Sequence, residues 1–231
     1  AQAVMDLFPG TKFGFGPAID EGFYYDFQLP RPATPDDLPA IEARMKEIIK
    51  GKHPFKHTEL SIDQARKQFA DQPFKVDQVN ALAAGELDEH GNSGANAATS
   101  VSTYTHDAFV DLCRGPHVAN TGDLPTDALK LLSIAGAYWR GSEKNPQLTR
   151  IYGTVWQSKK ELDDYLWRLE EAKKRDHRKL GKELGLFHFS DDIGPGLPLF
   201  TPKGEIIRHL MENYVREKQT RYGYQHVWTG H

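Results

Sequence analysis

The sequence predicts an α+β fold in which short strands and helices are followed by a long charged helix. Short aromatic runs bounded by glycine and proline recur between residues 1 and 156, with helix-forming segments between them. A capping pattern at Ser158 and Glu161 then begins a stretch with leucines at helical spacing. Of the 231 residues, 39% are hydrophobic, which is enough for one core and part of a second.

The first residues predict a short helix and then strands. Residues 1–8 form the end of a helix, which the Pro9–Gly10 pair closes. Strands are expected around 13–15 and 23–27, and the aromatic run in the second suits a strand with a buried face.

Two helices and a loop are predicted next. Thr34 caps the first helix, with Pro35 at its first helical position, and its apolar positions continue to Ile48. A second helix covers 62–69. The stretch 83–102 is rich in Gly, Asn, Ser and Ala without periodicity, so a mobile surface loop is expected there.

Short strands return over 106–156, and the pattern then changes to helix. From Ser158, leucines at helical spacing predict one continuous helix as far as Leu180. Gly181 and Gly185 are its natural stops.

The last residues predict a strand at 197–200 and a helix over 204–222. The change from turn-rich strands to a charged helix marks a domain boundary, so the chain is expected to divide at 1–156, 157–184 and 185–231. The final helix is expected to bury its apolar side chains, which are Ile207, Leu210, Met211, Tyr214 and Val215.

Composition excludes several classes of protein. A net charge of −3 gives no global signal for nucleic acid, so any such contact must come from local patches. The single cysteine excludes an internal disulfide and fits a reducing compartment. No apolar run approaches the ~20 residues that cross a bilayer. The chain starts at Ala1 without a basic leader or an initiating methionine, so a piece of a longer protein is expected.

The most informative run is Asp111–His117, which reads Asp-Leu-Cys-Arg-Gly-Pro-His. The Gly115–Pro116 turn can bring the thiol of Cys113 and the imidazole of His117 to one small site. These two groups are either half of a four-ligand zinc site or part of a polar clamp around a small substrate. A lone cysteine is otherwise a common small buried hydrophobic residue.

Four other sequence motifs occur together with the Asp111–His117 run. Taken with Asp111–His117, they resemble bacterial-type threonyl-tRNA synthetase in matching order over about residues 1–231. The resemblance implies a two-layer editing domain with antiparallel sheets and helices, lacking its first helix, at 1–156. It then implies a linker helix at 157–184 and the start of a class II catalytic core at 185–231. The four motifs are Gly22–Asp26, Ala135–Gly141, Arg150–Thr154 and Lys173–Lys179.

In that family the editing module hydrolyses seryl-tRNA made in error for threonine tRNA. One methyl group distinguishes the two amino acids by only ~1–3 kcal/mol, so a second pocket must remove the wrong ester. For the whole enzyme the resemblance implies threonine–tRNA ligase activity, with ATP, Mg and a catalytic Zn bound outside this chain and no cofactor within it. The implied partners are the acceptor end of tRNA(Thr) and the seryl ester, in a cytoplasmic homodimer without a membrane.

The motifs also assign site residues. Lys75, Asp111 and His117 form the expected catalytic set, in which Lys75 activates water or stabilises the oxyanion. Asp111 and Cys113 recognise the seryl group, and His117 orients both. Tyr25 matches a tyrosine that lines the pocket and contacts the substrate.

The family also carries a His-x-x-x-His pair on the helix that precedes the position of Ala1. His53 and His57 have the same spacing, but Pro54 interrupts the helix that would place both rings on one face. They are therefore predicted to be ordinary exposed or capping histidines.

Zinc at Cys113 and His117 is the alternative reading of the Asp111–His117 run. Alanyl-type editing proteins use the His-x-x-x-His pair and the Cys-x-x-x-His run together as zinc ligands. Cys113 and His117 alone are two ligands, which cannot complete a tetrahedral site.

The carboxy-terminal motifs carry further predictions. The helix at 204–222 resembles class II motif 1, which forms the dimer interface in that family. This chain is not expected to aminoacylate alone, and without the His-x-x-x-His pair it is expected to be impaired in editing. Two other functions stay open, a free-standing trans-editing aminoacyl-tRNA hydrolase with or without zinc, and a non-catalytic tRNA-binding module. The motif Lys173–Lys179 is rich in basic residues. It forms either a solvated helix face or a contact with tRNA phosphates, and the residues concerned are Lys173, Lys174, Arg175, Arg178 and Lys179.

Overall fold

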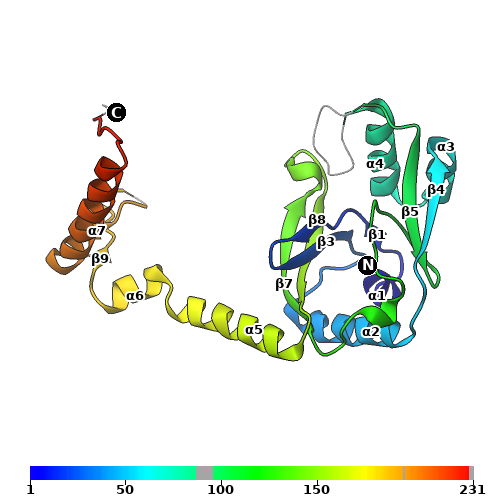
Figure 1. Ribbon diagram of the computed structural model, residues 1–231, viewed down its shortest axis with the longest axis horizontal. Coiled ribbons are helices and arrows are strands. Elements are labelled where there is room, and N and C mark those ends of the chain that lie inside the picture. The colour runs from blue at the N-terminus through cyan, green and yellow to red at the C-terminus, as the bar shows by residue number, and fades with distance from the viewer. Residues whose placement is uncertain (87–95, 195, 229–231) are drawn as a thin grey trace. The chain divides into compact units, whose positions relative to one another are not determined.

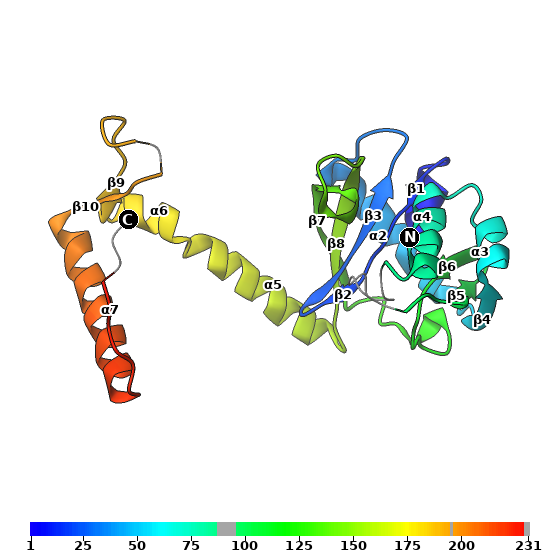
Figure 2. The same ribbon diagram turned by 90° about the horizontal axis from the view of Figure 1, so that it is seen from above.

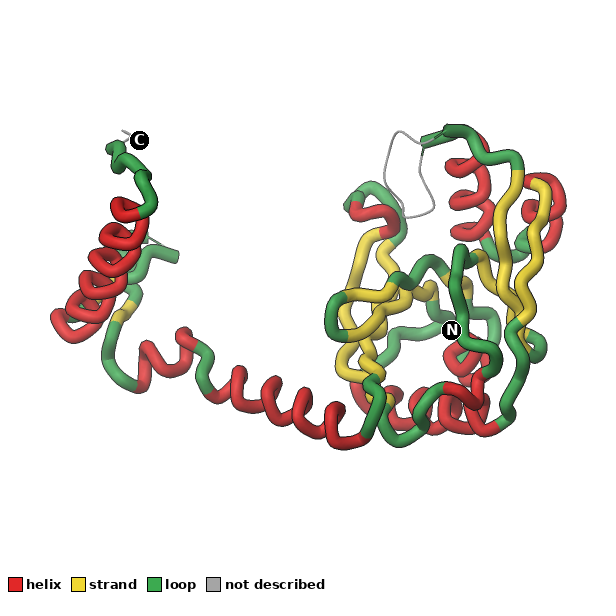
Figure 3. Tube along the Cα trace, viewed as in Figure 1, coloured by secondary structure: helices red, strands yellow, loops and turns green. Residues whose placement is uncertain are grey.

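The computed structural model describes residues 1–86, 96–194 and 196–228. The chain divides into two compact units, Ala1–Asp163 and Asp164–His231. Helices and strands are mixed in the first unit, whereas helices predominate in the second (Figures 1 and 3). The predicted α+β class is confirmed.

The described part of the first unit contains two antiparallel sheets. The larger has the order β1-β3-β8-β7, and β2 pairs with β3. The smaller has the order β4-β5-β6. The strands of the larger sheet are β1 (Lys12–Phe13), β2 (Ala18–Ile19), β3 (Gly22–Gln28), β7 (Leu129–Tyr138) and β8 (Gln147–Val155). Those of the smaller sheet are β4 (Lys56–Ser61), β5 (Ser100–His106) and β6 (Phe109–Leu112).

Helices cover both sheets. In Figures 1 and 2, α2 runs along the larger sheet, and α3 and α4 lie beside the smaller one. The helices are α1 (Gln2–Leu7), α2 (Leu38–Lys50), α3 (Ile62–Gln68) and α4 (Pro73–Ala84). Short 3₁₀ turns are η1 (Pro35–Asp37), η2 (Thr121–Asp123) and η3 (Trp139–Gly141).

Each sheet has its own apolar core. Phe13, Phe27 and Ile151 of the larger sheet pack with residues of α1 and α2. A second core lies between the smaller sheet and the two helices beside it, around Val79 and Val101. The side chain of Leu112 contacts both cores, so the end of β6 lies where they meet.

Local signals explain most of the helix boundaries. The backbone N–H of Thr34 donates to Asp37 Oδ2 at 2.8 Å, which fixes the 3₁₀ turn that leads into α2. The helix predicted after Thr34 is therefore confirmed, with a 3₁₀ first turn. The helix α3 begins with a reciprocal capping box, in which the N–H of Ser61 donates to Gln64 Oε1 at 2.9 Å.

The helix α4 was not predicted from the sequence. Pro73 stands at its start, and Gly85 at its end adopts the left-handed conformation with φ of 69°. The loop predicted over 83–102 begins after α4 and ends at β5, but residues 87–95 lie outside the described part of the chain.

A buried ion pair joins the middle of the larger sheet. Asp26 on β3 lies opposite Arg150 on β8. Arg150 donates from Nε and Nη2 to the two carboxylate oxygens at 2.7 and 2.8 Å. The same guanidinium lies 3.8 Å from the centre of the Tyr24 ring. The motifs Gly22–Asp26 and Arg150–Thr154 therefore form one structural unit.

The second unit begins within α5 (Lys159–Lys174) and continues with α6 (His177–Glu183). The prediction of one helix from Ser158 to Leu180 is wrong, because the helix ends at Lys174. Asp176 accepts a hydrogen bond from the N–H of Arg178 at 2.8 Å and so caps a new helix. Side-chain bonds of this kind compete with continuation of the preceding helix.

The chain then forms β9 (Phe187–His188), β10 (Leu199–Phe200) and α7 (Pro202–Arg221). The helix predicted over 204–222 is confirmed, and Thr201 caps it by accepting from the N–H of Gly204 at 3.2 Å. Its predicted burial is wrong in the part of the chain that the structure describes. The apolar side chains are 46–65% exposed, namely Ile207, Leu210, Met211, Tyr214 and Val215.

None of the described helices combines the length and the hydropathy that crossing a bilayer requires.

Candidate functional site

Lys75 lies in the first turn of α4, and its side chain is 1% exposed. Its Nζ lies 2.6 Å from Asp111 Oδ1 on β6. The hydroxyl of Tyr25, on β3, donates to Asp111 Oδ2 at 2.5 Å. Three of the predicted site residues therefore meet around one carboxylate, although they come from both sheets and from α4.

Aromatic rings surround this ion pair. Lys75 Nζ lies 5.2 Å from the centre of the Phe13 ring and 5.6 Å from that of Tyr25. Burial, together with the neighbouring Asp111 carboxylate, raises the pKa of Tyr25 well above its usual value. The phenol stays protonated at neutral pH and acts as a donor. A buried amine and carboxylate with defined partners can act on a polar substrate group without competition from water.

Cys113 and His117 form the second half of the site. His117 Nε2 lies 3.0 Å from Cys113 Sγ, and the N–H of Gly115 donates to the same sulfur at 3.4 Å. Gly115 has φ of 77°, and a Cβ there would come within 2.2 Å of the Tyr104 hydroxyl. Cys113 and His117 therefore converge across Gly115–Pro116 as predicted, and only glycine fits the first of these two positions.

The His117 ring stacks on Tyr104 with centroids 4.0 Å apart. Tyr104 lies on β5 directly opposite Asp111, so the ring connects the two halves of the site. Burial lowers the pKa of His117, and the negative charge of Asp111 opposes this only in part. The imidazole is therefore neutral at pH 7 and can accept a proton.

The two halves form one cluster. The negative charge of Asp111 acts on both the Tyr25 hydroxyl and the His117 imidazole. The structure thus brings together the five residues that the motifs single out, Tyr25, Lys75, Asp111, Cys113 and His117.

Several neighbours of the site were not predicted. The Phe55 ring lies 4.9 Å from His117 and 4.8 Å from His106. Burial lowers the pKa of His106 to about 4, so this ring is also neutral. The alternation of Tyr104 and His106 along β5 is the sequence signal that could have placed both on the site face.

The pair His53 and His57 does not lie on a helix. Pro54 pairs with Asn120 in an isolated bridge, and the N–H of His53 donates to Thr121 Oγ1 at 2.9 Å. His57 is an exposed residue of β4, and its ring lies 5.0 Å from that of Tyr104. Pro54 therefore interrupts any helix between the two histidines, as predicted.

The zinc alternative gains no further ligand from the described residues. They include no group of three or more His, Cys, Asp or Glu side chains arranged to hold a metal ion. Cys113 and His117 could supply two ligands, and a tetrahedral site would need two more from elsewhere.

The five basic residues expected to contact tRNA are exposed, and each forms an ion pair with a nearby acidic residue. Lys173 pairs with Glu170 at 2.7 Å, and Lys174 pairs with Glu171 at 2.8 Å. Exposed pairs of this kind are weak and exchange readily with other anions. The other pairs are Arg175–Glu171, Arg178–Asp176 and Lys179–Glu183.

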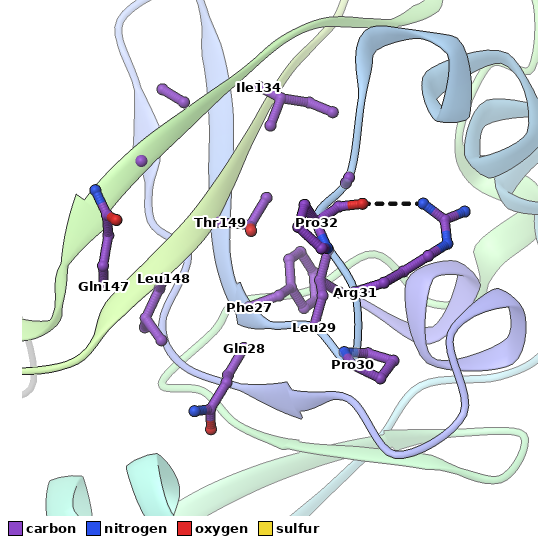
Figure 4. A pocket seen from close by; sticks show the side chains of 13 residues that line it. Phe27, Gln28, Leu29, Pro30, Arg31, Pro32, Ile134, Gln147, Leu148 and Thr149 are labelled. Atoms are coloured by element: carbon purple, nitrogen blue, oxygen red, sulfur yellow. Dashed lines mark hydrogen bonds between the residues drawn. The ribbon is translucent and has the colours of Figure 1, made fainter.

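A groove of about 540 Å³ lies elsewhere in the first unit. It is bounded by the end of β3, the loop 29–33 and the facing parts of β7 and β8 (Figure 4). Arg31 donates to the carbonyl oxygen of Pro32 at 3.0 Å in its wall. The groove shares no lining residue with the Lys75–His117 cluster.

Comparison with known proteins agrees with this arrangement. Residues 101–152 match the second additional domain of threonyl and alanyl tRNA synthetases. The whole chain is 53% identical to a threonine–tRNA ligase of Rubrobacter xylanophilus, of which it covers 34%. Over its whole length, the chain is homologous to part of the bacterial threonine–tRNA ligases.

Other threonine–tRNA ligases give the same result. Identity is 51% to that of Dehalococcoides mccartyi, with 37% of the relative covered, and 50% to that of Borreliella burgdorferi, with 38% covered. The chain therefore spans about a third of the length of the curated relatives it matches. The resemblance to threonyl-tRNA synthetase that the five motifs indicated is confirmed, and the matched second additional domain contains Asp111, Cys113 and His117.

Proposed function

We propose that this chain carries the editing module of a threonine–tRNA ligase, and that its site hydrolyses the seryl ester of mischarged tRNA(Thr). The contact of Lys75 and Tyr25 with Asp111, beside the Cys113–His117 pair, is the observation that carries the proposal. This cluster combines the buried amine of Lys75, the carboxylate of Asp111 and the neutral imidazole of His117, which are the kinds of group that ester hydrolysis requires.

Lys75 stabilises the oxyanion in the proposed reaction. Water adds to the ester carbonyl carbon, and the carbonyl oxygen becomes negatively charged. The oxyanion then re-forms the carbonyl as the ester C–O bond breaks, the proton lost by the attacking water passes to the ribose oxygen, and serine is released. Because Lys75 Nζ forms an ion pair with Asp111 Oδ1 at 2.6 Å, stabilisation of the oxyanion suits Lys75 better than activation of water.

Asp111 and Cys113 recognise the seryl group, and His117 orients the thiol. The Asp111 carboxylate already accepts from Tyr25, so it is fixed in place before substrate binds. The gap left for the amino-acid side chain is then set by the thiol and the rings of Tyr104 and Tyr25.

The full-length protein is expected to deacylate seryl-tRNA(Thr) at least ~10-fold faster than threonyl-tRNA(Thr), the discrimination that one methyl group can give in a tight pocket. Release of amino acid from the two labelled tRNAs under single-turnover conditions measures this ratio. Equal rates would contradict a pocket sized for serine, and no release from either would contradict ester hydrolysis.

Deacylation is expected to continue in the presence of a metal chelator, because no three His, Cys, Asp or Glu side chains among the described residues are arranged to hold a metal ion. Metal content is measured on the 231-residue chain and on its Cys113→Ala variant, so that metal bound elsewhere in the full-length protein does not interfere. Stoichiometric zinc that Cys113→Ala removes, together with loss of deacylation in chelator, would establish the zinc alternative.

For the whole protein we propose threonine–tRNA ligase activity, with ATP, Mg and a catalytic Zn bound outside this chain. Its partner is the acceptor end of tRNA(Thr), with phosphate contacts from the basic residues of α5 and α6. The exposed apolar face of α7 supports a homodimer, and the single free cysteine supports a cytoplasmic location. Sedimentation of the full-length protein with and without Leu210→Glu tests the dimer.

A further inference from the structure

The motif Ala135–Gly141 supplies none of the proposed site residues, yet its side chains bind the helix that carries Lys75. Trp139 Nε1 donates to Asp77 Oδ2 at 2.8 Å. Arg140 Nη2 lies 2.8 Å from the same carboxylate and donates to the carbonyl oxygen of Asp77 at 3.1 Å. Asp77 follows Lys75 by two positions in α4, so the motif is connected to the site through one residue.

Two other contacts hold the same turn of α4. The Phe74 ring packs on Trp139 with centroids 5.0 Å apart. The side-chain oxygen of buried Gln72 accepts from the N–H of Phe13 on β1 at 3.1 Å. The residues on both sides of Lys75 are therefore tied to the larger sheet, whereas Asp111 belongs to the smaller one.

The backbone of Arg140 adopts φ of 52° and ψ of 28°, the left-handed conformation that residues with side chains seldom take. Gly141 follows with φ of 68°. This turn directs the guanidinium back toward α4. Strain of this kind persists where the surrounding contacts require it.

The ion pair between Asp77 and Arg140 is partly exposed, so this pair adds little to stability. The side chain of Asp77 is 48% exposed, and that of Arg140 is 30% exposed. Exposed ion pairs contribute little to folding.

The effect of the contact on geometry is larger. An extended lysine places Nζ about 8 Å from the helix axis, so a rotation of about 10° moves it by about 1.4 Å. A displacement of about 1 Å at a reacting group can lower a rate by ~10²-fold.

We propose that Asp77, held by Trp139 and Arg140, is a positioning residue that fixes the rotation of α4 and so places Lys75 Nζ at the ester oxyanion. The inference rests on the proposed function, since it takes Lys75 to act in ester hydrolysis.

The test measures deacylation of seryl-tRNA(Thr) by the full-length protein. Asp77→Ala is expected to lower kcat about tenfold with KM within about twofold, because it changes the placement of Lys75 and not substrate binding. Asp77→Asn is expected to recover part of the rate, since its amide oxygen still accepts from Trp139 Nε1. Asn80→Ala is the matched control, because it removes another exposed side-chain bond to α4, from Arg66 at 2.8 Å, and is expected to leave kcat unchanged.

A double variant separates positioning from a merely structural role. Asp77→Ala is expected to cause no further loss in a Lys75→Met background, whereas an independent effect would multiply the two losses and overturn the inference. An unfolding midpoint that falls in parallel with kcat would also overturn it. If Lys75→Met deacylates seryl-tRNA(Thr) slowly but Asp77→Ala deacylates it as fast as the parent protein, the inference about Asp77 fails and the proposed function stands. If Lys75→Met keeps the full deacylation rate, the proposed function fails.

Discussion

Replacing the buried Lys75 with methionine is expected to lower deacylation of seryl-tRNA(Thr) by the full-length protein by about 10²-fold or more. This is the usual scale for removing a group that stabilises an oxyanion or moves a proton. Methionine fills most of the volume of the lysine stem but carries no charge, so the Asp111 carboxylate keeps only its bond from Tyr25. Single-turnover release of serine measures the loss.

Two controls accompany this variant. Lys56→Met makes the same change at an exposed residue of β4 and is expected to leave the rate unchanged. Tyr25→Phe removes one bond to Asp111 but keeps the ion pair, so a smaller loss is expected. Circular dichroism must show that Lys75→Met is folded, because breaking a buried ion pair is destabilising. A folded Lys75→Met protein with an unchanged rate would refute the role of Lys75 in ester hydrolysis.

The residues of the candidate site could be listed in advance because sequence motifs identify residues without knowledge of the fold. Lys75, Tyr25 and Asp111 were assigned by resemblance, and nothing in spacing or periodicity places them in contact. Their meeting depends on the pairing of β3 with β8 and on the placement of α4, which are tertiary features. The Gly115–Pro116 turn is the exception, since local chemistry alone predicted that Cys113 and His117 would converge.

The helix α4 shows where periodicity fails. Its buried residues do not follow one stripe, because one side faces the smaller sheet and another faces Trp139. An amphipathic pattern is therefore absent, although Pro73 and Gly85 mark the two ends. The contact of Asp77 with Trp139, 62 positions away, could not be read from the sequence at all.

Two predictions for the carboxy-terminal part of the chain were wrong, the single helix to Leu180 and the burial of the apolar face of α7, and their causes differ. The helix break after Lys174 follows from one side-chain cap at Asp176, which competes with helix continuation over a single turn. The exposure of the apolar face of α7 has a different origin. A hydrophobic stripe predicts that a face is covered but does not say by which part of the protein, and no described residue of this chain covers it.

Loss of the Asp26–Arg150 pair is expected to have the largest effect on stability. Arg150→Met would leave the Asp26 carboxylate, 4% exposed at the centre of the larger sheet, without its cation. Removing one partner of a buried pair costs about 3–5 kcal/mol of unfolding free energy, and about 3 kcal/mol is expected here because the Arg150 side chain is 24% exposed. Chemical denaturation of the 231-residue chain measures the change.

The chain offers a matched comparison for this variant. Arg31 also binds a carboxylate through two nitrogens, at 2.7 and 3.1 Å from Asp37, but its side chain is 56% exposed. Arg31→Met makes the same chemical change, and it is expected to shift the denaturation midpoint by much less, because water solvates the carboxylate that remains. Equal shifts for the two variants would show that burial of Asp26 does not govern the stability of the sheet. A large shift for Arg150→Met alone would establish that the motifs Gly22–Asp26 and Arg150–Thr154 hold together the sheet from which Tyr25 reaches the site.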